Sequence, residues 1–255
     1  MIIKNFKNGL VQVRIFDNRE AMGECSGSEI ANRIKQLQKE KDEINLMFAA
    51  APSQNEVLQT LAADKDIDWS RINAFHMDEY VGLEKGHPSS FGYYLHNMLL
   101  SNLKLNGIYF IDSSAEDSEA EAERYAKMLQ SHPIDICILG VGENGHIAFN
   151  DPSVADFNDP LIVKVVYLED RSKTQQVNDG CFASADLVPD KAITVTVPGL
   201  LAATYMYCSV PGATKADAIK AMLSGEVSEK CPCSILTTRQ NVWVYLDADS
   251  GSLVI

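Results

Sequence analysis

IDICILGVGENGHIAFND, residues 134–151, is the stretch of this chain that decides its fold. Its first eight residues, 134–141, are almost all apolar, which is typical of a short strand buried on both faces of a sheet. The residues that follow are small, polar or ionisable, and their glycines allow a tight turn with exposed N–H groups. The pattern predicts a strand of a parallel sheet that ends in a ligand-binding loop.

Similar apolar runs flank this strand on both sides and alternate with segments of helical periodicity. Further strands are expected at 10–16, 44–51, 72–75, 108–111, 162–167, 192–195, 206–210 and 242–246. Helices are expected at 28–39, 56–63, 91–100, 118–129 and 214–223. This alternation predicts an α/β fold, a doubly wound, mostly parallel Rossmann-like sheet with helices on both faces. A chain of 255 residues suits one domain, 1–255.

Composition excludes several classes of function. The formal net charge is −13, and nucleic acids and anionic membranes are bound through basic patches, so neither is an expected partner. No run of 18 apolar residues and no signal-peptide pattern occurs, and we expect a cytoplasmic protein. The six cysteines lack the paired spacing of zinc sites, so we expect reduced thiols and no bound metal.

Four expected strands end in polar or ionisable residues, which a parallel sheet brings to one edge. These ends are 52–55, 76–80, 142–146 and 211–215. Asp78 should be partly withdrawn from water and lies beside Glu79, and both effects raise the pKa of a carboxyl group. Two interpretations of Asp78 stay open at this point: a general base, or a cap of the next helix or turn.

His146 lies at the end of the 134–141 strand, with Glu143 and Asp151 on either side in sequence. A histidine at a strand end with a carboxylate to orient it is what acid–base catalysis requires, and we favour that role over a solvated loop histidine. Lys215, at the start of the 214–223 helix, would add a cation to free N–H groups and form a phosphate site. Its alternative is a solvated surface lysine.

Two longer segments carry a resemblance to a known family. FHMDEYVGL at 75–83 and GVGENGHIAFNDP at 140–152 resemble the hallmark motifs of the glucosamine-6-phosphate deaminase/isomerase family. The resemblance continues through 188–195 and the helix of Lys215 to the last strand, so it covers most of the chain. The related 6-phosphogluconolactonases share the Gly-His loop but lack the Met-Asp-Glu-Tyr segment.

The resemblance implies an enzyme that acts on an amino-sugar 6-phosphate without a metal or an organic cofactor. It assigns opening of the sugar ring to His146 and transfer of a proton from C2 to C1 to Asp78, through an enolamine. Water then hydrolyses the resulting imine to a ketose phosphate and ammonia. Asn144 and Asp151 stand where the family supports the histidine. The predicted substrate- and phosphate-binding residues are Ser53, Gln54, Gly140, Gly142, Lys173 and Lys215.

The chain departs from the family pattern at the supporting residues. The family usually has Asp at the position of Asn144 and Glu at that of Asp151. An amide cannot pair with a positive imidazolium as a carboxylate does, which leaves Asp151 or Glu143 for that task. The usual Thr-Gly-Gly-Thr phosphate loop is Pro-Ser-Gln-Asn at 52–55, and Lys173 and Arg171 are candidates for the expected phosphate-binding arginine.

These departures leave the sugar epimer open between glucosamine and galactosamine 6-phosphate. Two other functions compete with the deaminase. A lactonase would use His146 to activate water and would need no base at Asp78. A non-catalytic sugar-phosphate sensor would resemble effector domains of transcription regulators, but no helix-turn-helix or basic arm occurs in this sequence. The sequence leaves assembly into a homo-oligomer open.

Overall fold

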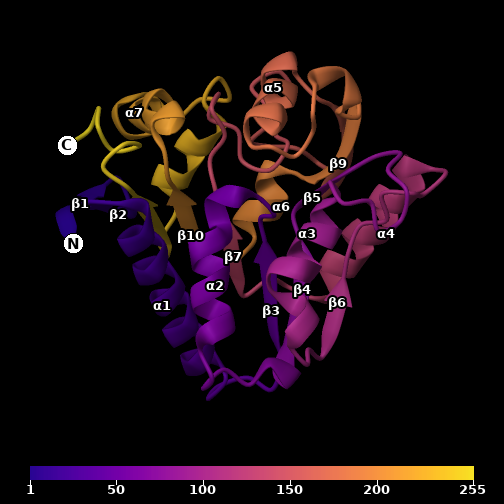
Figure 1. Cartoon of the computed structure of the whole chain (residues 1–255), viewed down its shortest axis with the longest axis horizontal. Coiled ribbons are helices and arrows are strands. Elements are labelled where there is room, and N and C mark those ends of the chain that lie inside the picture. Colours follow the sequence, from indigo (N-terminus) through magenta and orange to yellow (C-terminus); the bar gives the residue numbers. More distant parts are fainter.

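An eight-stranded sheet forms the centre of the molecule in the computed structural model, which describes all 255 residues (Figure 1). The strand order is β1-β2-β11-β10-β7-β3-β4-β6, and every neighbouring pair is parallel except β1 and β2. The strands are β1 Ile2–Asn8, β2 Val11–Phe16, β3 Ile44–Phe48, β4 Ile72–His76, β6 Gly107–Tyr109, β7 Ile136–Leu139, β10 Tyr205–Val210 and β11 Val242–Leu246. The expected mostly parallel sheet is confirmed.

Helices cover both faces of this sheet. One face packs against α1 Arg19–Leu37, α2 Asn55–Ala63 and α3 Phe91–Met98, and the other against α4 Ser118–Ser131, α6 Val197–Leu201 and α7 Ala216–Ser224. The two apolar clusters contain 34 and 31 buried residues. In β7, Ile136 and Ile138 enter one cluster, whereas Cys137 and Leu139 enter the other. A strand buried on both faces explains the unbroken apolar run that the sequence shows at this point.

Helix α1 begins at Arg19, nine residues before the expected start at residue 28, because Asn18 caps it by accepting a hydrogen bond from the N–H of Ala21. Its first half carries small residues where it crosses α2. A Cβ atom on Gly23 would lie 2.3 Å from Cβ of Glu56, so only glycine fits there. Small residues permit close packing but give no apolar periodicity, which is why the sequence pattern indicates only the second half of this helix.

A second, three-stranded sheet stands above the carboxyl ends of the first. It consists of β5 Asp78–Tyr80, β9 Lys191–Val195 and β8 Val163–Tyr167, paired antiparallel in the order β5-β9-β8. The expected strands 162–167 and 192–195 therefore lie outside the main parallel sheet, which corrects the sequence-based interpretation. Only Met77 separates β4 from β5, so the chain passes directly from one sheet to the other at Asp78.

The remaining elements are short, apart from one polar helix. Helix α5, Asp170–Asn178, lies beside the small sheet at the top of Figure 1. The 3₁₀ helices are η1 Pro52–Gln54, η2 Trp69–Arg71, η3 Leu100–Asn102, η4 Ala185–Leu187, η5 Ala213–Lys215 and η6 Pro232–Thr238. None of the helices is long and apolar enough to cross a bilayer.

Candidate active site

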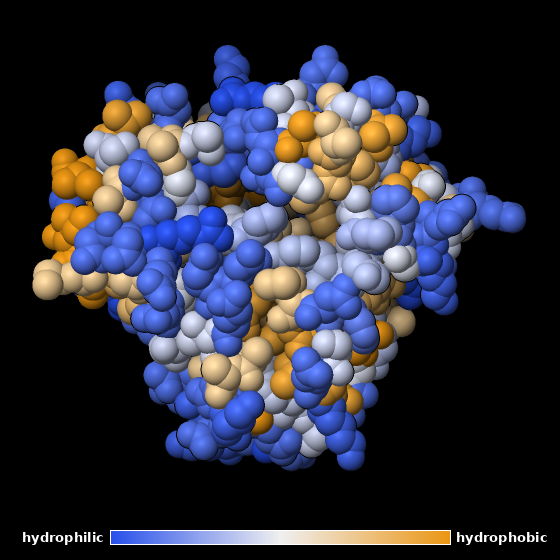
Figure 2. Space-filling view, in the orientation of Figure 1, coloured by the Kyte–Doolittle hydropathy of each residue, from blue (hydrophilic) through white to orange (hydrophobic).

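A pocket opens where the strand order reverses, beyond the carboxyl ends of β3, β4 and β7. Ligands of open α/β sheets bind at this kind of position. The pocket encloses about 530 Å³ of space, its open mouth included, and Figure 2 shows the hollow near the middle of the displayed face. Its walls are Ala49, Ala50, Ala51, Ser53, Met77, Asp78, Phe91, Gly140, Val141, Gly142, His146, Ala148, Phe149, Gln175 and Gln176.

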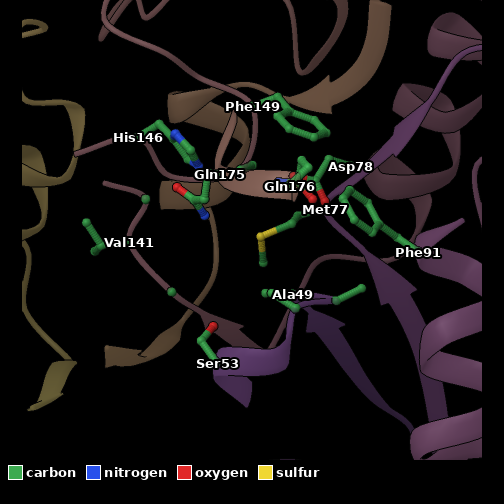
Figure 3. A pocket seen from close by; sticks show the side chains of 15 residues that line it. Ala49, Ser53, Met77, Asp78, Phe91, Val141, His146, Phe149, Gln175 and Gln176 are labelled. Carbon is green, nitrogen blue, oxygen red and sulfur yellow. The ribbon is translucent and has the colours of Figure 1, made fainter. Parts of the chain in front are cut away.

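Asp78 enters the pocket from the junction between the two sheets (Figure 3). Its residue is 8% exposed, and no protein group donates a hydrogen bond to its carboxylate. Burial, with a smaller contribution from the charge of Glu79, raises the pKa of Asp78 to about 8. An isolated carboxyl group in an apolar setting keeps its proton near neutral pH and becomes a strong base once ionised.

Glu79 performs the capping that one interpretation assigned to Asp78. Its carboxylate accepts hydrogen bonds from the N–H groups of Tyr80, Phe91 and Gly92, the last two at the start of α3. Burial raises the pKa of Glu79 to about 7, although these three hydrogen bonds oppose the shift. Because neighbouring strand residues point to opposite sides, Glu79 holds the helix while Asp78 faces the pocket.

His146 reaches the pocket from the loop after β7, and its ring lies directly over Gly142. A Cβ atom on Gly142 would lie within 2.1–2.4 Å of three ring atoms, so this position requires glycine. Nδ1 of His146 contacts Oδ1 of Asn144 at 2.7 Å and Oδ1 of Asp151 at 3.0 Å. Both contacts are acceptors, so Nδ1 carries the proton and Nε2, which has no protein partner, is the free nitrogen.

Asp151 is the buried charge beside this histidine. It is fully buried and also accepts hydrogen bonds from the Ser172 hydroxyl at 2.6 Å and from the Asn144 amide at 2.9 Å. Burial alone would raise the pKa of Asp151, but its interactions with His146, then Asn144 and Ser172, lower that pKa to about 2. Asp151 is therefore the carboxylate that touches the imidazole, and Glu143 makes no such contact.

The loop after β3 contributes one predicted residue to the pocket and holds another behind it. Ser53 lines the pocket, and so does Gly140, which directly follows β7. Gln54 does not; its fully buried side chain donates to Ser53 Oγ at 3.1 Å and to the Ser209 carbonyl at 3.0 Å. A Cβ atom on Gly140 would stand 3.0 Å from the Gln54 amide nitrogen, so these two residues fit together across the strand ends.

Lys215 is buried, so the alternative prediction of a solvated surface lysine is wrong. It is 6% exposed, at the end of η5 beyond β10, and does not itself line the pocket. Its Nζ has no hydrogen-bond partner. Burial lowers the pKa of Lys215, although the charges of Asp179 and Glu143 oppose that effect. A buried ammonium group without a partner is costly unless a ligand supplies an anion.

Lys173 and Arg171 do not line the pocket. The Lys173 ammonium pairs with the exposed carboxylate of Asp190, and the Arg171 guanidinium donates to the Glu143 carbonyl at 2.9 Å. Neither residue belongs to the pocket wall. No group of three or more His, Cys, Asp or Glu side chains is arranged to hold a metal ion.

Helix α5 supplies pocket residues that sequence reasoning missed. Gln175 and Gln176 project into the pocket from it (Figure 3), while Ser172 supports Asp151 from behind. Gln175 accepts a hydrogen bond from the N–H of Glu143 at 2.9 Å, whereas the Gln176 amide has no protein partner. The sequence of α5, DRSKTQQVN, has almost no apolar residues, so its only signal was polar composition beside a strand.

The fold and the paired acid–base groups define an α/β enzyme whose site lies at the switch point of a parallel sheet. The family model described as glucosamine-6-phosphate isomerases/6-phosphogluconolactonase matches residues 17–245, and the chain belongs to this family. It is 34% identical to a glucosamine-6-phosphate deaminase of Listeria welshimeri over 229 residues, 90% of this chain and 96% of the relative. A Bacillus cereus glucosamine-6-phosphate deaminase is also 34% identical, over 86% of this chain and 82% of the relative.

Solved structures agree with this assignment. A monomeric glucosamine-6-phosphate deaminase superposes with a TM-score of 0.86 at 29% identity, covering 94% of this chain and 99% of the other. A 6-phosphogluconolactonase from Thermotoga maritima gives a TM-score of 0.73 at 22% identity, over 93% of this chain and 99% of the other. The second likeness shows the shared fold.

Proposed function

We propose that this enzyme converts an amino-sugar 6-phosphate to a ketose 6-phosphate and ammonia. The observation that carries this is the pairing, in one pocket, of an unpartnered carboxyl group whose pKa burial raises to about 8, Asp78, with a histidine held in one tautomer. The name shared by the curated relatives, glucosamine-6-phosphate deaminase, supports the same reaction.

Ring opening is the step assigned to His146. Because Nδ1 carries a proton held by Asn144 and Asp151, Nε2 is free to accept the proton of the anomeric hydroxyl and return it to the ring oxygen. The Asp151 carboxylate stabilises the imidazolium that forms between these two transfers. The C1–O5 bond breaks and C1 becomes an aldehyde.

Proton transfer between C2 and C1 is the step assigned to Asp78. The ionised carboxylate takes the C2 proton of the open-chain aminoaldose, and the electrons form the C1–C2 double bond. The C2 ammonium group gives a proton to the C1 oxygen, which produces a neutral enolamine. The carboxylic acid then returns a proton to C1, which leaves an imine at C2. Water adds to this imine and releases ammonia. A carboxylate whose pKa is near 8 is a better base for a C–H proton than an ordinary one, and the apolar walls of Met77 and Phe91 maintain that basicity.

The 6-phosphate is assigned to the strand ends of β3 and β10, where Ser53 and Lys215 lie. The unpartnered Lys215 ammonium supports this because it lacks the counter-ion that a phosphate would supply. The net charge of −13 makes such a local cation necessary to hold an anionic substrate.

The test is ammonia release from glucosamine 6-phosphate and galactosamine 6-phosphate, side by side. We expect release from at least one, lost in Asp78→Asn and kept in Asp186→Asn, a control at an exposed carboxylate. Release from neither sugar would contradict the proposal, and hydrolysis of 6-phosphogluconolactone unaffected by Asp78→Asn would replace it with a lactonase.

Three further properties are proposed with this function and stay predictions. The chain forms one domain over 1–255, it acts in the cytoplasm, and its reaction needs no organic cofactor. The oligomeric state is open, although the structural neighbour named as a deaminase is a monomer. Size-exclusion chromatography with light scattering would settle it.

A further inference from the structure

The Asn144 amide can adopt only one orientation. Its Nδ2 lies 2.9 Å from Asp151 Oδ1 and 3.3 Å from Glu169 Oε2, and both are acceptors. Its Oδ1 lies 3.2 Å from the backbone N–H of His146 and 2.7 Å from the Nδ1 of the same residue. A flipped amide would turn its NH₂ group toward a backbone donor and an oxygen toward two carboxylates.

Glu169 contacts this cluster through both its side chain and its backbone. It follows β8 and precedes α5, where its Oε1 accepts the N–H of Ser153 at 3.0 Å. Its own N–H points to Asp151 Oδ2 at 3.4 Å. The Glu169 carboxylate does not touch the histidine or the pocket, and its hydrogen bond to the Asn144 amide is the contact that links this carboxylate to the partners of His146.

We propose that Glu169 is a positioning residue for His146, whose carboxylate fixes the Asn144 amide so that Nδ1 keeps its proton and Nε2 stays free for the substrate. The inference rests on the proposed function of His146 in ring opening. In this cluster the two negative charges are the carboxylates of Asp151 and Glu169, and residue 144 carries none. The neutral amide of Asn144 lies between the two carboxylates. An aspartate at 144 would bring three carboxylates together, because both partners of Nδ2 are negative.

The test exchanges the amide of residue 144 and the carboxylate of residue 169, which leaves the combined charge of the two side chains unchanged. Asn144→Asp alone should lower kcat by about 10- to 100-fold, because the new carboxylate is repelled from the position that orients the ring. Glu169→Gln alone should lower kcat by about 3- to 10-fold with KM nearly unchanged. In the double variant, the amide introduced at position 169 donates to the carboxylate introduced at position 144, and kcat should rise well above that of Asn144→Asp, although Asp151 still repels the new carboxylate. Asn178→Asp, an exposed residue of α5, controls for added charge.

Two readouts separate positioning from mere structure. The acid limb of the kcat–pH profile should move in each single variant and return in the double variant. Thermal unfolding should show a lower Tm for Asn144→Asp and recovery in the double variant. Recovery of Tm without recovery of kcat or of the pH profile would overturn the proposal, since the pair would then be structural only.

Other results are equally decisive. If the losses in kcat multiply, so that the double variant is worse than either single one, the proposal fails. It also fails if Glu169→Gln leaves kcat and its pH profile unchanged, and this arm does not depend on the folding of Asn144→Asp. If the unmodified enzyme releases no ammonia, the proposed function fails instead, while the Tm comparison still reports whether residues 144 and 169 are coupled.

Discussion

The junction between β4 and β5 and the loop after β7 each bring one ionisable side chain to the pocket, but they hold it in opposite ways. Asp78 stands between apolar neighbours and receives no hydrogen bond from the protein. His146 is fixed by Asn144 and Asp151 and has only one free ring nitrogen. A base that must take a proton from carbon gains from isolation, whereas a group that must move protons between oxygens gains from fixed orientation.

Replacing the isolated group should have the largest effect. Asp78→Asn should lower kcat by about 10³-fold or more, because the amide cannot accept the C2 proton. It should also raise stability at neutral pH. The unfolded carboxyl ionises above a pKa near 3.8 but the folded one only near 8, so the cost of keeping it appears between these values and is complete above pH 8.

The measurement is thermal unfolding of Asp78→Asn and the unmodified protein at pH 5 and pH 8. The variant should gain about 1–2 kcal/mol at the higher pH, which for this length corresponds to roughly 2–8 °C, and less at pH 5. A variant that loses both activity and stability would show that Asp78 has a structural role.

Removing the charge of Asp151, which orients His146, should lower kcat less than Asp78→Asn does, and it should lower stability instead of raising it. Asp151→Asn should lower kcat by about 10²-fold, because the imidazolium loses its counter-ion. The folded pKa of Asp151 is lowered to about 2, so its stabilisation is complete above its unfolded pKa near 4 and disappears as the pH falls toward 2. The Tm difference between variant and unmodified protein should shrink over that range; a constant difference would contradict this.

Lys215, beyond the end of β10, allows substrate binding to be tested separately from the catalytic step. Lys215→Met should raise KM for the 6-phosphate by about 30-fold with little change in kcat, because the substrate loses a cation that does not touch the reacting carbons. The variant should be more stable than the unmodified protein, since an unpartnered buried ammonium is replaced by an apolar group of similar length. Lys220→Met, exposed on α7, is the matched control. Equal KM in both variants would remove Lys215 from the phosphate site.

The smallest expected effect is at Gln176. Its amide lines the pocket without a protein partner, so it is free to bind a sugar hydroxyl. Gln176→Ala should raise KM by about 5-fold, and by different factors for the glucosamine and galactosamine substrates. Asn178→Ala on the same helix should leave both unchanged. Identical KM changes for the two epimers would show that Gln176 does not distinguish them.

Much of the fold could be predicted because the strands of the main sheet are buried on both faces. The apolar run before Gly140 became β7, and the runs at 44–51, 206–210 and 242–246 match β3, β10 and β11 to within a few residues. Their parallel pairing then placed 52–55, 76–80 and 142–146 around one pocket.

The remainder depended on contacts between distant segments. Nothing local distinguishes β8 and β9 from strands of the main sheet; they pair with β5 because the chain turns at Met77. Helix α5 is held by Ser172 and Gln175 rather than by an apolar face. In the site, the choice between base and cap for Asp78 is decided only by the position of Glu79 at the start of α3.

The central claim is that Asp78 is an isolated base with an elevated pKa, and ¹³C NMR titration of its side-chain carboxyl tests it most directly. The signal is assigned as the one missing from Asp78→Asn. We predict a titration midpoint near pH 8 in the enzyme without ligand, since burial and Glu79 both disfavour the charged form. A midpoint near pH 4 would contradict the claim and leave the pocket without a base suited to the C2 proton.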